Sequence, residues 1–218
     1  MECIKLGKAK RKTRKNKKYF FVIILGIMLI IISLILLISR YCYHEEKKAN
    51  DKKQVDDYLN YTTVDKVETN EVISEDDNND KVAANYVAAL EIPAIELRRG
   101  LLNRDDPNNN VNKNIYMLKD TVLPDESDVS HIILASHSGN SYISYFKNLY
   151  KLDINDEVYF YYKNTKYVYS IYKIYEVDKT GNVELKITNN SDITLITCKG
   201  NLNKQIVVIG TLKSKEAY

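Results

Sequence analysis

The sequence has few residues of the two types that most often bind metals or form disulfides. It contains three cysteines and three histidines in 218 residues: Cys3, Cys42, Cys198, His44, His131 and His137. No group of them shows the spacing of zinc ligands, so we expect no metal site. From residue 82 onward there is a single cysteine, which excludes a disulfide scaffold. A lone thiol of this kind is either buried and inert or retained for chemistry.

Charge is absent from residues 19–39, a stretch of 21 residues. As a helix that rises about 1.5 Å per residue, it would span roughly 30 Å, the thickness of a bilayer core. A soluble helix of this length would show a polar face, and this stretch shows none. Its apolar core is also longer than that of a cleavable signal peptide, and no small-x-small cleavage site follows it. The sequence therefore predicts a retained transmembrane anchor.

The charges beside this segment predict its orientation. Residues 1–18 contain nine Lys/Arg and one Glu. Clusters of basic residues next to a span stay in the cytoplasm, so we expect the N-terminus inside the cell and residues 41–218 outside it. A basic tail also occurs in nucleic-acid-binding proteins, but beside an apolar span the topology explains it, and we expect no nucleic-acid partner. With this topology Cys3 and Cys42 lie on opposite sides of the membrane and cannot pair.

Residues 40–81 are predicted to form an acidic, flexible linker. Residues 41–81 contain twelve acidic and six basic residues, and apolar residues are sparse. A weak 3–4 spacing in residues 55–59 is typical of a short helix, whereas the Asp/Asn-rich end cannot bury enough surface to become ordered. Residues 76–80 lack the glycine and the distal glutamate of an EF-hand loop, which favours a spacer over a calcium site.

Residues 82–218 show the pattern of a small, mainly β domain. The clearest strands, residues 158–162 and 167–175, are dense in aromatic and β-branched residues and are separated by a turn at 163–166. Aromatic stripes of this kind usually serve packing. We also predict strands at 90–97, 115–118, 132–136, 193–198 and 205–212, loops at 98–100 and 105–110, and a short helix within 142–152. About seven short strands separated by turns predict a small antiparallel β-barrel with one or two short helices.

Two of these strands end on side chains that can react together. Residues 193–197 form an apolar, β-branched run that leads to Cys198, and residues 132–136 lead to His137. The thiolate is the attacking form of cysteine, and it needs a base or a cation nearby. A histidine after an apolar strand is more often structural than catalytic, but its pairing with a strand-end thiol favours catalysis. The other two histidines have no such partner, and we assign them no role.

The strand end Thr-Leu-Ile-Thr-Cys at residues 194–198 lies about sixty residues after an Ala-Ser-His turn at residues 135–137. This arrangement resembles the sortases of Gram-positive bacteria, which are membrane-anchored cysteine transpeptidases. The resemblance covers roughly residues 90–212. Ser136 stands where the family commonly has glycine, which is a change between small residues.

The resemblance implies a sortase-like β-barrel and a role for each residue that matches the family motif. Cys198 would attack a peptide carbonyl and form a thioester. His137 would protonate the departing amine and then deprotonate the incoming one. Leu195, Thr197 and Ser138 would contact the substrate, and no cofactor would be needed.

The chain departs from the family at one functional position. Sortases carry an arginine where the strand after the cysteine begins, and it is thought to bind the substrate backbone and the oxyanion. Gln205 stands there in this sequence, and no arginine occurs after Arg104. Gln205 keeps a hydrogen-bond donor without the charge or the forked geometry. Lys204 keeps a charge, one residue away from the pattern. Three explanations stay open: Gln205 does the work, Lys204 replaces the arginine through a bulge or shifted register, or the enzyme is weak.

The resemblance implies a cell-surface cysteine transpeptidase that cleaves a C-terminal sorting signal of the Leu-Pro-x-Thr-Gly type and transfers the protein to an amine. Its partners would be surface proteins with such a signal, an amine of a cell-wall precursor or of a pilin-like lysine, and the membrane through residues 19–39. Two alternatives stay open. One is an inactive sortase-like module that binds surface proteins, which the lost arginine motivates. The other is a single-pass scaffold or receptor whose cysteine is merely buried.

Overall fold

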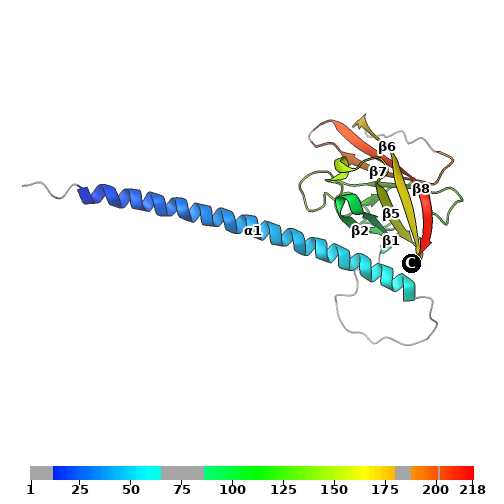
Figure 1. Ribbon diagram of the computed structural model, residues 1–218, viewed down its shortest axis with the longest axis horizontal. Helices are drawn as coiled ribbons and strands as arrows, with labels where there is room; N and C mark the ends of the chain where they lie inside the picture. The colour runs from blue at the N-terminus through cyan, green and yellow to red at the C-terminus, as the bar shows by residue number, and fades with distance from the viewer. Residues whose placement is uncertain (1–11, 65–85, 180–187, 201) are drawn as a thin grey trace, which may run out of the picture. The chain divides into compact units, whose positions relative to one another are not determined.

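The computed structural model describes residues 12–64, 86–179, 188–200 and 202–218 (Figure 1). The chain divides into two compact units, Met1–Ala49 and Asn50–Tyr218. A long helix, α1, covers Lys12–Val64 and therefore contributes to both units.

The first unit contains the membrane-spanning candidate. Within α1, the segment Tyr19–Tyr43 is long and apolar enough to cross a bilayer, judged by length and composition alone. Most of its large apolar side chains are more than half exposed, with values from 44% at Ile32 to 70% at Phe21. A continuous exposed apolar surface of this kind is unfavourable in water. The helix is therefore consistent with the anchor predicted over residues 19–39.

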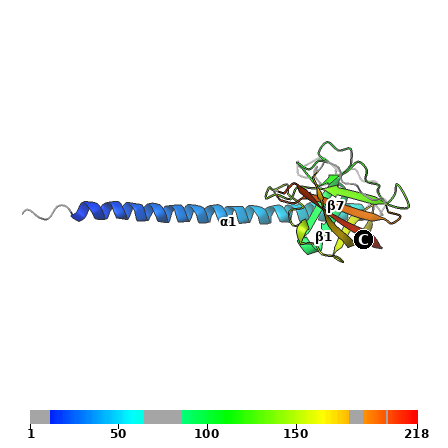
Figure 2. The same ribbon diagram turned by 90° about the horizontal axis from the view of Figure 1, so that it is seen from above.

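The second unit is built on one eight-stranded sheet. Its strands are β1 (Tyr86–Ile92), β2 (Leu97–Leu102), β3 (Tyr116–Met117), β4 (His131–Ala135), β5 (Glu157–Tyr162), β6 (Thr165–Asp178), β7 (Asp192–Cys198) and β8 (Lys204–Ala217), with two 3-10 helices, η2 (Pro93–Ile95) and η3 (Leu149–Lys151). The strand order is β2-β1-β5-β6-β8-β7-β4-β3. The two edge strands, β2 and β3, also contact each other, so the sheet curls into a nearly closed barrel. Figure 2 shows the strands of this unit from above. This confirms the mainly β barrel with short helices, although the helix predicted within residues 142–152 is reduced to η3.

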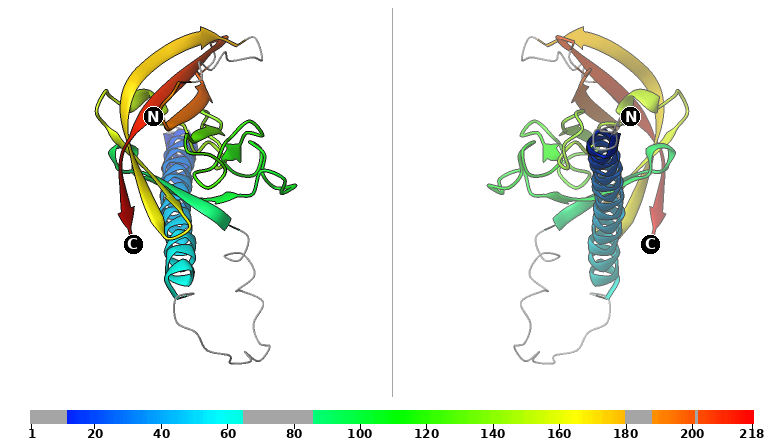
Figure 3. Two further views of the ribbon diagram at one scale, coloured as in Figure 1. Left: turned by 90° about the vertical axis from the view of Figure 1, so that its right-hand side faces the viewer. Right: turned by 90° about the vertical axis from the view of Figure 1, so that its left-hand side faces the viewer.

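One apolar core fills the barrel. Leu90, Phe160, Tyr169, Leu195 and Val208 come from five different strands, are at most 1% exposed and belong to a single cluster. Burying a large apolar side chain stabilises a fold by about 1.5–3 kcal/mol relative to leaving it exposed. The long strands β6 and β8 pair along their whole length and arch over one side of the barrel (Figure 3).

Strands β5 and β6 form the hairpin that the aromatic pattern predicts. Lys163 and Asn164 connect them and have φ angles of 45° and 59°. Two successive positive φ angles are typical of a type I′ turn, whose twist matches that of the flanking strands. Tyr162 is 6% exposed, and its hydroxyl donates to Asp125 at the surface. The tyrosines of this hairpin therefore serve packing, as predicted, although Tyr169 also buries its hydroxyl in the core.

Two local predictions are wrong. The strand expected over residues 90–97 breaks at Pro93, because η2 begins there and a proline ring favours the start of a helical turn. The loop expected at residues 98–100 is instead part of β2. Gly100 fits this strand because an added Cβ atom would lie 2.5 Å from the ring of Tyr86. A glycine can therefore mark a close approach inside a strand as well as a loop.

Residues 50–64 of α1 belong to the second unit and pack on the barrel. Val55 is fully buried and Tyr58 is 6% exposed, both in a cluster with residues of β1 and β5. The hydroxyl of Tyr58 donates to the backbone carbonyl of Val87 at 2.8 Å. The weak 3–4 spacing in the sequence lies in this helical segment. The rest of the expected linker, residues 65–81, lies outside the described residues.

Strands β4 and β7 are parallel neighbours, an exception to the antiparallel pairing expected of the barrel. On its other side β7 is antiparallel to β8. Two parallel strands need a long crossover connection, and here it contains η3, β5 and β6. Because the two strands run in the same direction, their C-terminal ends meet at one edge of the sheet.

Candidate active site

Cys198 is the last residue of β7, where a buried strand reaches the edge of the sheet. The other six residues of β7 are buried, whereas Cys198 is half-buried. Its thiol is not in a disulfide. Hydrogen-bonded neighbours on both sides of β7 hold this strand end rigidly, and the partial exposure leaves the sulfur accessible.

The register of β4 and β7 brings His137 level with Cys198. Ala135 lies opposite Ile196 in the parallel ladder. The amide of Ser136 donates to the carbonyl of Ile196 at 3.2 Å, which continues the pairing beyond the end of β4. His137 and Cys198 each lie two residues beyond this last ladder pair. The thiol and the imidazole are therefore carried by adjacent strand ends.

Leu195 and Thr197, two of the expected substrate contacts, face away from the thiol. The hydroxyl of Thr197 donates to the carbonyl of Ser136 at 2.8 Å, and its side chain is 3% exposed. Leu195 is 1% exposed and lies in the barrel core. Successive side chains of a strand point to opposite faces, so neither shares the face of Cys198. Thr197 ties the ends of β4 and β7 together.

The loop after His137 folds back onto His137 itself and onto Ser136, the residue before it. The backbone carbonyl of His137 accepts a hydrogen bond from the amide of Phe146 at 3.2 Å, and Phe146 is fully buried. The hydroxyl of Ser136 donates to the carbonyl of Ile143 at 3.4 Å. Ser138, the third expected substrate contact, is half-buried directly after the histidine. These contacts fix the backbone that carries the imidazole.

The ring of His137 has a partner that the sequence did not suggest. Its Nε2 atom lies 3.2 Å from Oδ1 of Asn112, in the connection between β2 and β3. The sequence marks this region only as a loop rich in asparagine. A contact between residues 25 positions apart, one of them in a loop, leaves no periodic signal in the sequence.

Gln205 and Lys204, the two candidates for the role of the missing arginine, lie on opposite faces of β8. Gln205 lies directly opposite Cys198 in the β7–β8 ladder, and side chains of opposite residues share a face. The Oε1 atom of Gln205 is buried and has no hydrogen-bond partner among the described residues. Lys204 is the preceding residue and faces the other way. Its Nζ atom lies 3.8 Å from Oε2 of Glu176 on β6.

Glu176 binds the lysines on both sides of the β7–β8 turn. Nζ of Lys199 donates to its Oε1 atom, and Lys204 lies near Oε2. The hydrogen bond from Lys199, followed by the charges of both ammonium groups, holds the pKa of Glu176 below its ordinary value. The backbone of the turn is closed by a hydrogen bond from the Lys199 amide to the Lys204 carbonyl at 2.9 Å. Both cations are therefore engaged by a carboxylate.

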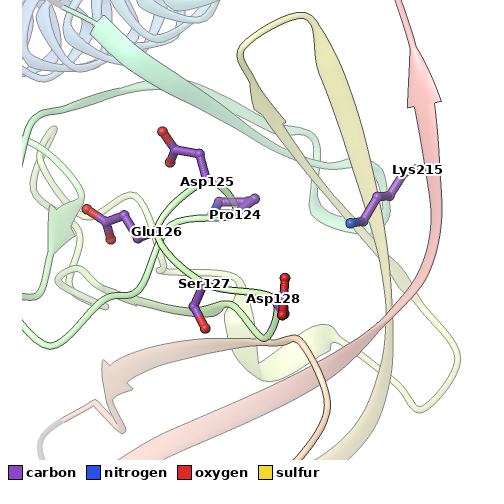
Figure 4. A pocket seen from close by; sticks show the side chains of 6 residues that line it. All are labelled: Pro124, Asp125, Glu126, Ser127, Asp128 and Lys215. Carbon is purple, nitrogen blue, oxygen red and sulfur yellow. The ribbon is translucent and has the colours of Figure 1, made fainter.

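A separate pocket lies far from the end of β7. It has a volume of about 540 Å³ and is lined by Pro124, Asp125, Glu126, Ser127, Asp128 and Lys215 (Figure 4). Lys215 is ten residues along β8 from Gln205, or roughly 33 Å at about 3.3 Å per residue. Lys163 and Tyr162 both donate to Asp125, and these bonds hold the pKa of that carboxyl below its usual range. In the described part of the chain no three or more His, Cys, Asp or Glu side chains gather to hold a metal ion.

Comparisons with known proteins concern the same part of the chain. A family model described as a sortase domain matches residues 90–213, more than half of the chain, and includes His137 and Cys198. No curated protein matches the sequence.

Sortase A of Listeria monocytogenes is similar in structure at 20% identity and a TM-score of 0.52, covering 62% of this chain and 91% of that one. A lid mutant of sortase A from Corynebacterium diphtheriae matches at 20% identity and a TM-score of 0.53, covering 76% and 95%. Sortase C1 of Streptococcus agalactiae matches at 21% identity and a TM-score of 0.52, covering 75% and 89%. At these identities the structures support the fold, and the family model supports the family.

Proposed function

Because the chain belongs to the sortase family of cysteine transpeptidases, we propose that it cleaves a C-terminal sorting signal and transfers the severed protein to an amine. The register of β4 and β7, which brings the ends of the two strands together, carries this proposal. By resemblance to the family, the signal is of the Leu-Pro-x-Thr-Gly type. The acceptor is an amine of a cell-wall precursor or a lysine of another surface subunit.

The reaction has two half-reactions that share one thiol and one imidazole. In the first, the thiolate of Cys198 attacks the scissile carbonyl carbon, the C–N bond breaks, and the imidazolium of His137 gives its proton to the departing amine. The acyl part of the substrate stays on the sulfur as a thioester. In the second, the acceptor amine attacks the thioester and loses a proton to the neutral imidazole. The thiolate leaves, and the enzyme returns to its starting state.

We assign stabilisation of the developing oxyanion to Gln205 rather than to Lys204. Gln205 is the ladder partner of Cys198, whereas Lys204 is held by Glu176 on the other face. An amide carries both a donor and an acceptor. Its nitrogen can donate to the oxyanion, and its oxygen, which has no partner among the described residues, can accept from the N–H of an extended peptide. A neutral donor stabilises negative charge less than an arginine does, so we expect slow turnover.

The remaining predicted residues act around this pair. In this proposal Leu195 and Thr197 support the strand that carries the thiol, and Ser138 lines the rim of the site beside His137. Residues 82–218 form the catalytic domain, and the helix over residues 19–39 anchors it as a single span.

The topology is part of the same proposal. The basic residues before the span favour a cytoplasmic N-terminus, which places the catalytic domain at the cell surface, where sorting signals and wall precursors are found. A protease-accessibility assay on intact cells tests it: external protease should remove the domain and leave an epitope tag at the N-terminus protected. Cleavage of the N-terminal tag from outside would contradict this topology.

A second function remains because of one observation, the neutral side chain at the position of the arginine. A sortase-like module that binds sorting signals without turnover would keep the same fold and the same strand ends. The two functions differ in what Cys198→Ala does. If the chain is an enzyme, the variant loses the product and keeps peptide binding, and if it is a binding module, the wild type forms no product either.

The test uses the full-length chain in detergent micelles with a pool of Leu-Pro-x-Thr-Gly-type peptides and two amines, an oligoglycine and a lysine peptide. Mass spectrometry of the mixture should show peptides joined to one of the amines. Cys198→Ala should abolish this product, and the matched variant Cys42→Ala, which removes an exposed free thiol elsewhere, should not. Peptides that bind to the wild type but are never cleaved would instead support the binding module.

A further inference from the structure

A side chain from outside the two catalytic strands contacts the ring of His137. The Oδ1 atom of Asn112 lies 3.2 Å from Nε2 of the ring. An amide oxygen can only accept a hydrogen bond, so Nε2 carries the hydrogen in this contact. The hydrogen bond made by one ring nitrogen determines which tautomer a neutral histidine adopts. Asn112 therefore lies where it can fix both the orientation and the tautomer of the ring.

Two buried asparagines fix the loop that carries Asn112, which we call the asparagine loop (residues 103–115). Asn109 is 5% exposed, and its amide exchanges two hydrogen bonds of 2.9 Å with the backbone of β3. Asn114 is 3% exposed, and its amide nitrogen donates to a backbone carbonyl of β2 at 3.2 Å. Asn112 thus lies between two points that are anchored to different strands.

Arg99 joins the asparagine loop to the loop after His137. Its Nε atom donates to Oδ1 of Asn114 at 3.0 Å. Its guanidinium carbon lies 4.7 Å from the ring centroid of Tyr145, which is a cation–π contact. Tyr145 directly precedes Phe146, whose amide donates to the backbone carbonyl of His137. The two loops are therefore held in a fixed relation by one side chain of β2.

We propose that Asn112 is a positioning residue that holds His137 in the Nε2–H tautomer during transpeptidation, an inference that rests on the proposed function. With Nε2–H bonded to Asn112, proton exchange occurs at Nδ1. The imidazolium gives its Nδ1 proton to the departing amine and becomes the neutral Nε2–H tautomer, which Asn112 already binds. Nδ1 then takes a proton from the acceptor amine. The same hydrogen bond persists through both half-reactions, so the imidazole ring does not need to rotate between them.

The contact can be tested because the loop does not depend on this side chain for its turn. The backbone amide of Asn112 donates to Oδ1 of Asn110 at 3.1 Å, and Asn112→Ala keeps that bond. The matched control is Asn108→Ala in the same loop. Asn108 is also exposed, and its Oδ1 atom accepts from Lys113 at 2.7 Å. A general weakening of the loop would affect both variants, whereas loss of the ring contact affects one.

The first readout needs no substrate. ¹⁵N spectra of the histidine-labelled full-length chain in micelles report the tautomer of each ring, and the variant His137→Ala identifies the signals. At a pH high enough for the imidazole to be neutral, the wild type should show the ring of His137 almost entirely as the Nε2–H tautomer. Asn112→Ala should shift it towards the mixture found for free histidine, and Asn108→Ala should leave it unchanged. An unchanged tautomer ratio in Asn112→Ala would overturn the proposal.

The second readout is turnover. Loss of one hydrogen bond should lower kcat about 3- to 10-fold in Asn112→Ala while KM stays within a factor of about two. Asn112→Gln retains an amide and should recover part of kcat. An equal loss in Asn108→Ala, or a shifted tautomer with unchanged kcat, would overturn the positioning role. If the wild type turns over no peptide, the proposed function fails, and the ¹⁵N spectra still decide whether Asn112 holds His137.

Discussion

Strand β8 connects two ends of the barrel that differ in how their polar groups are paired. Near its start, Gln205 has a buried amide oxygen without a partner among the described residues, opposite the free thiol of Cys198. Near its end, Lys215 borders a pocket in which the carboxylate of Asp125 is bonded by two donors. A buried polar group without a partner costs stability, so it is retained where something else requires it. The difference favours the proposed chemistry at the start of β8, where Gln205 faces the thiol, and structural ion pairs at its end.

Among the variants that test this comparison, removal of the His137 imidazole should lower kcat the most. His137→Ala removes the proton donor and acceptor and should lower kcat by about 10²- to 10⁴-fold, the usual contribution of general acid–base catalysis. His131→Ala, which changes a histidine at the opposite end of β4, should stay within a few-fold of wild type. Steady-state kinetics with a cleaved peptide measures both. Equal losses in the two variants would mean that the position of His137 beside the thiol has no special role.

The next effect should separate the two neighbours on β8. Gln205→Ala removes the proposed oxyanion donor, and donors of this kind contribute about 2.7–4 kcal/mol, or about 10²- to 10³-fold in kcat. Lys204→Ala breaks an exposed ion pair with Glu176, and such pairs contribute at most about 1 kcal/mol, so kcat should change by less than about 5-fold. If Lys204→Ala is instead the more damaging change, a shifted register has given the lysine the role of the arginine.

The smallest effect should come from the end of β8 that borders the pocket. The pKa of Asp125 is depressed in the folded chain, because Lys163 and then Tyr162 bond its ionised form. A depressed pKa stabilises the fold above the unfolded value of about 3.9, and this stabilisation is lost as the pH falls through the lower folded value. Asp125→Asn should therefore lower the Tm by up to about 4 °C at pH 7 and by less near pH 3.

Calorimetric or fluorescence melts of the full-length chain at the two pH values measure this difference. The kcat of Asp125→Asn should equal that of wild type. A large loss of turnover in this variant would show that the pocket takes part in function, which would remove the contrast between the two ends of the barrel.

Much of the fold follows from local patterns in the sequence. The alternation of aromatic and β-branched residues in β5 and β6 depends on near neighbours, so the hairpin and its turn could be predicted. The apolar run of residues 193–197 that stops at a thiol likewise locates the end of β7. The break at Pro93 could not be predicted from the alternation of apolar and polar residues, because that alternation continues through residues 90–97. The strand ends there because the proline starts a helical turn.

The site depends on contacts between segments that are distant in the sequence, and these were less predictable. Which face of β8 carries Gln205 follows from the β7–β8 register, and register is set by the whole barrel. The parallel pairing of β4 with β7 needs the crossover that contains η3, β5 and β6. The contact of Asn112 with His137 depends on how two loops are anchored, and neither loop carries a periodic pattern.

The most direct test of the account is the intact mass of the full-length chain after incubation with a Leu-Pro-x-Thr-Gly-type peptide and no acceptor amine. We expect a mass increase equal to the acyl part of the peptide, located on Cys198 by fragmentation, removed by hydroxylamine and absent in Cys198→Ala. Peptide that binds the chain but never adds mass to it, while Cys198 still reacts readily with iodoacetamide, would contradict the thioester mechanism.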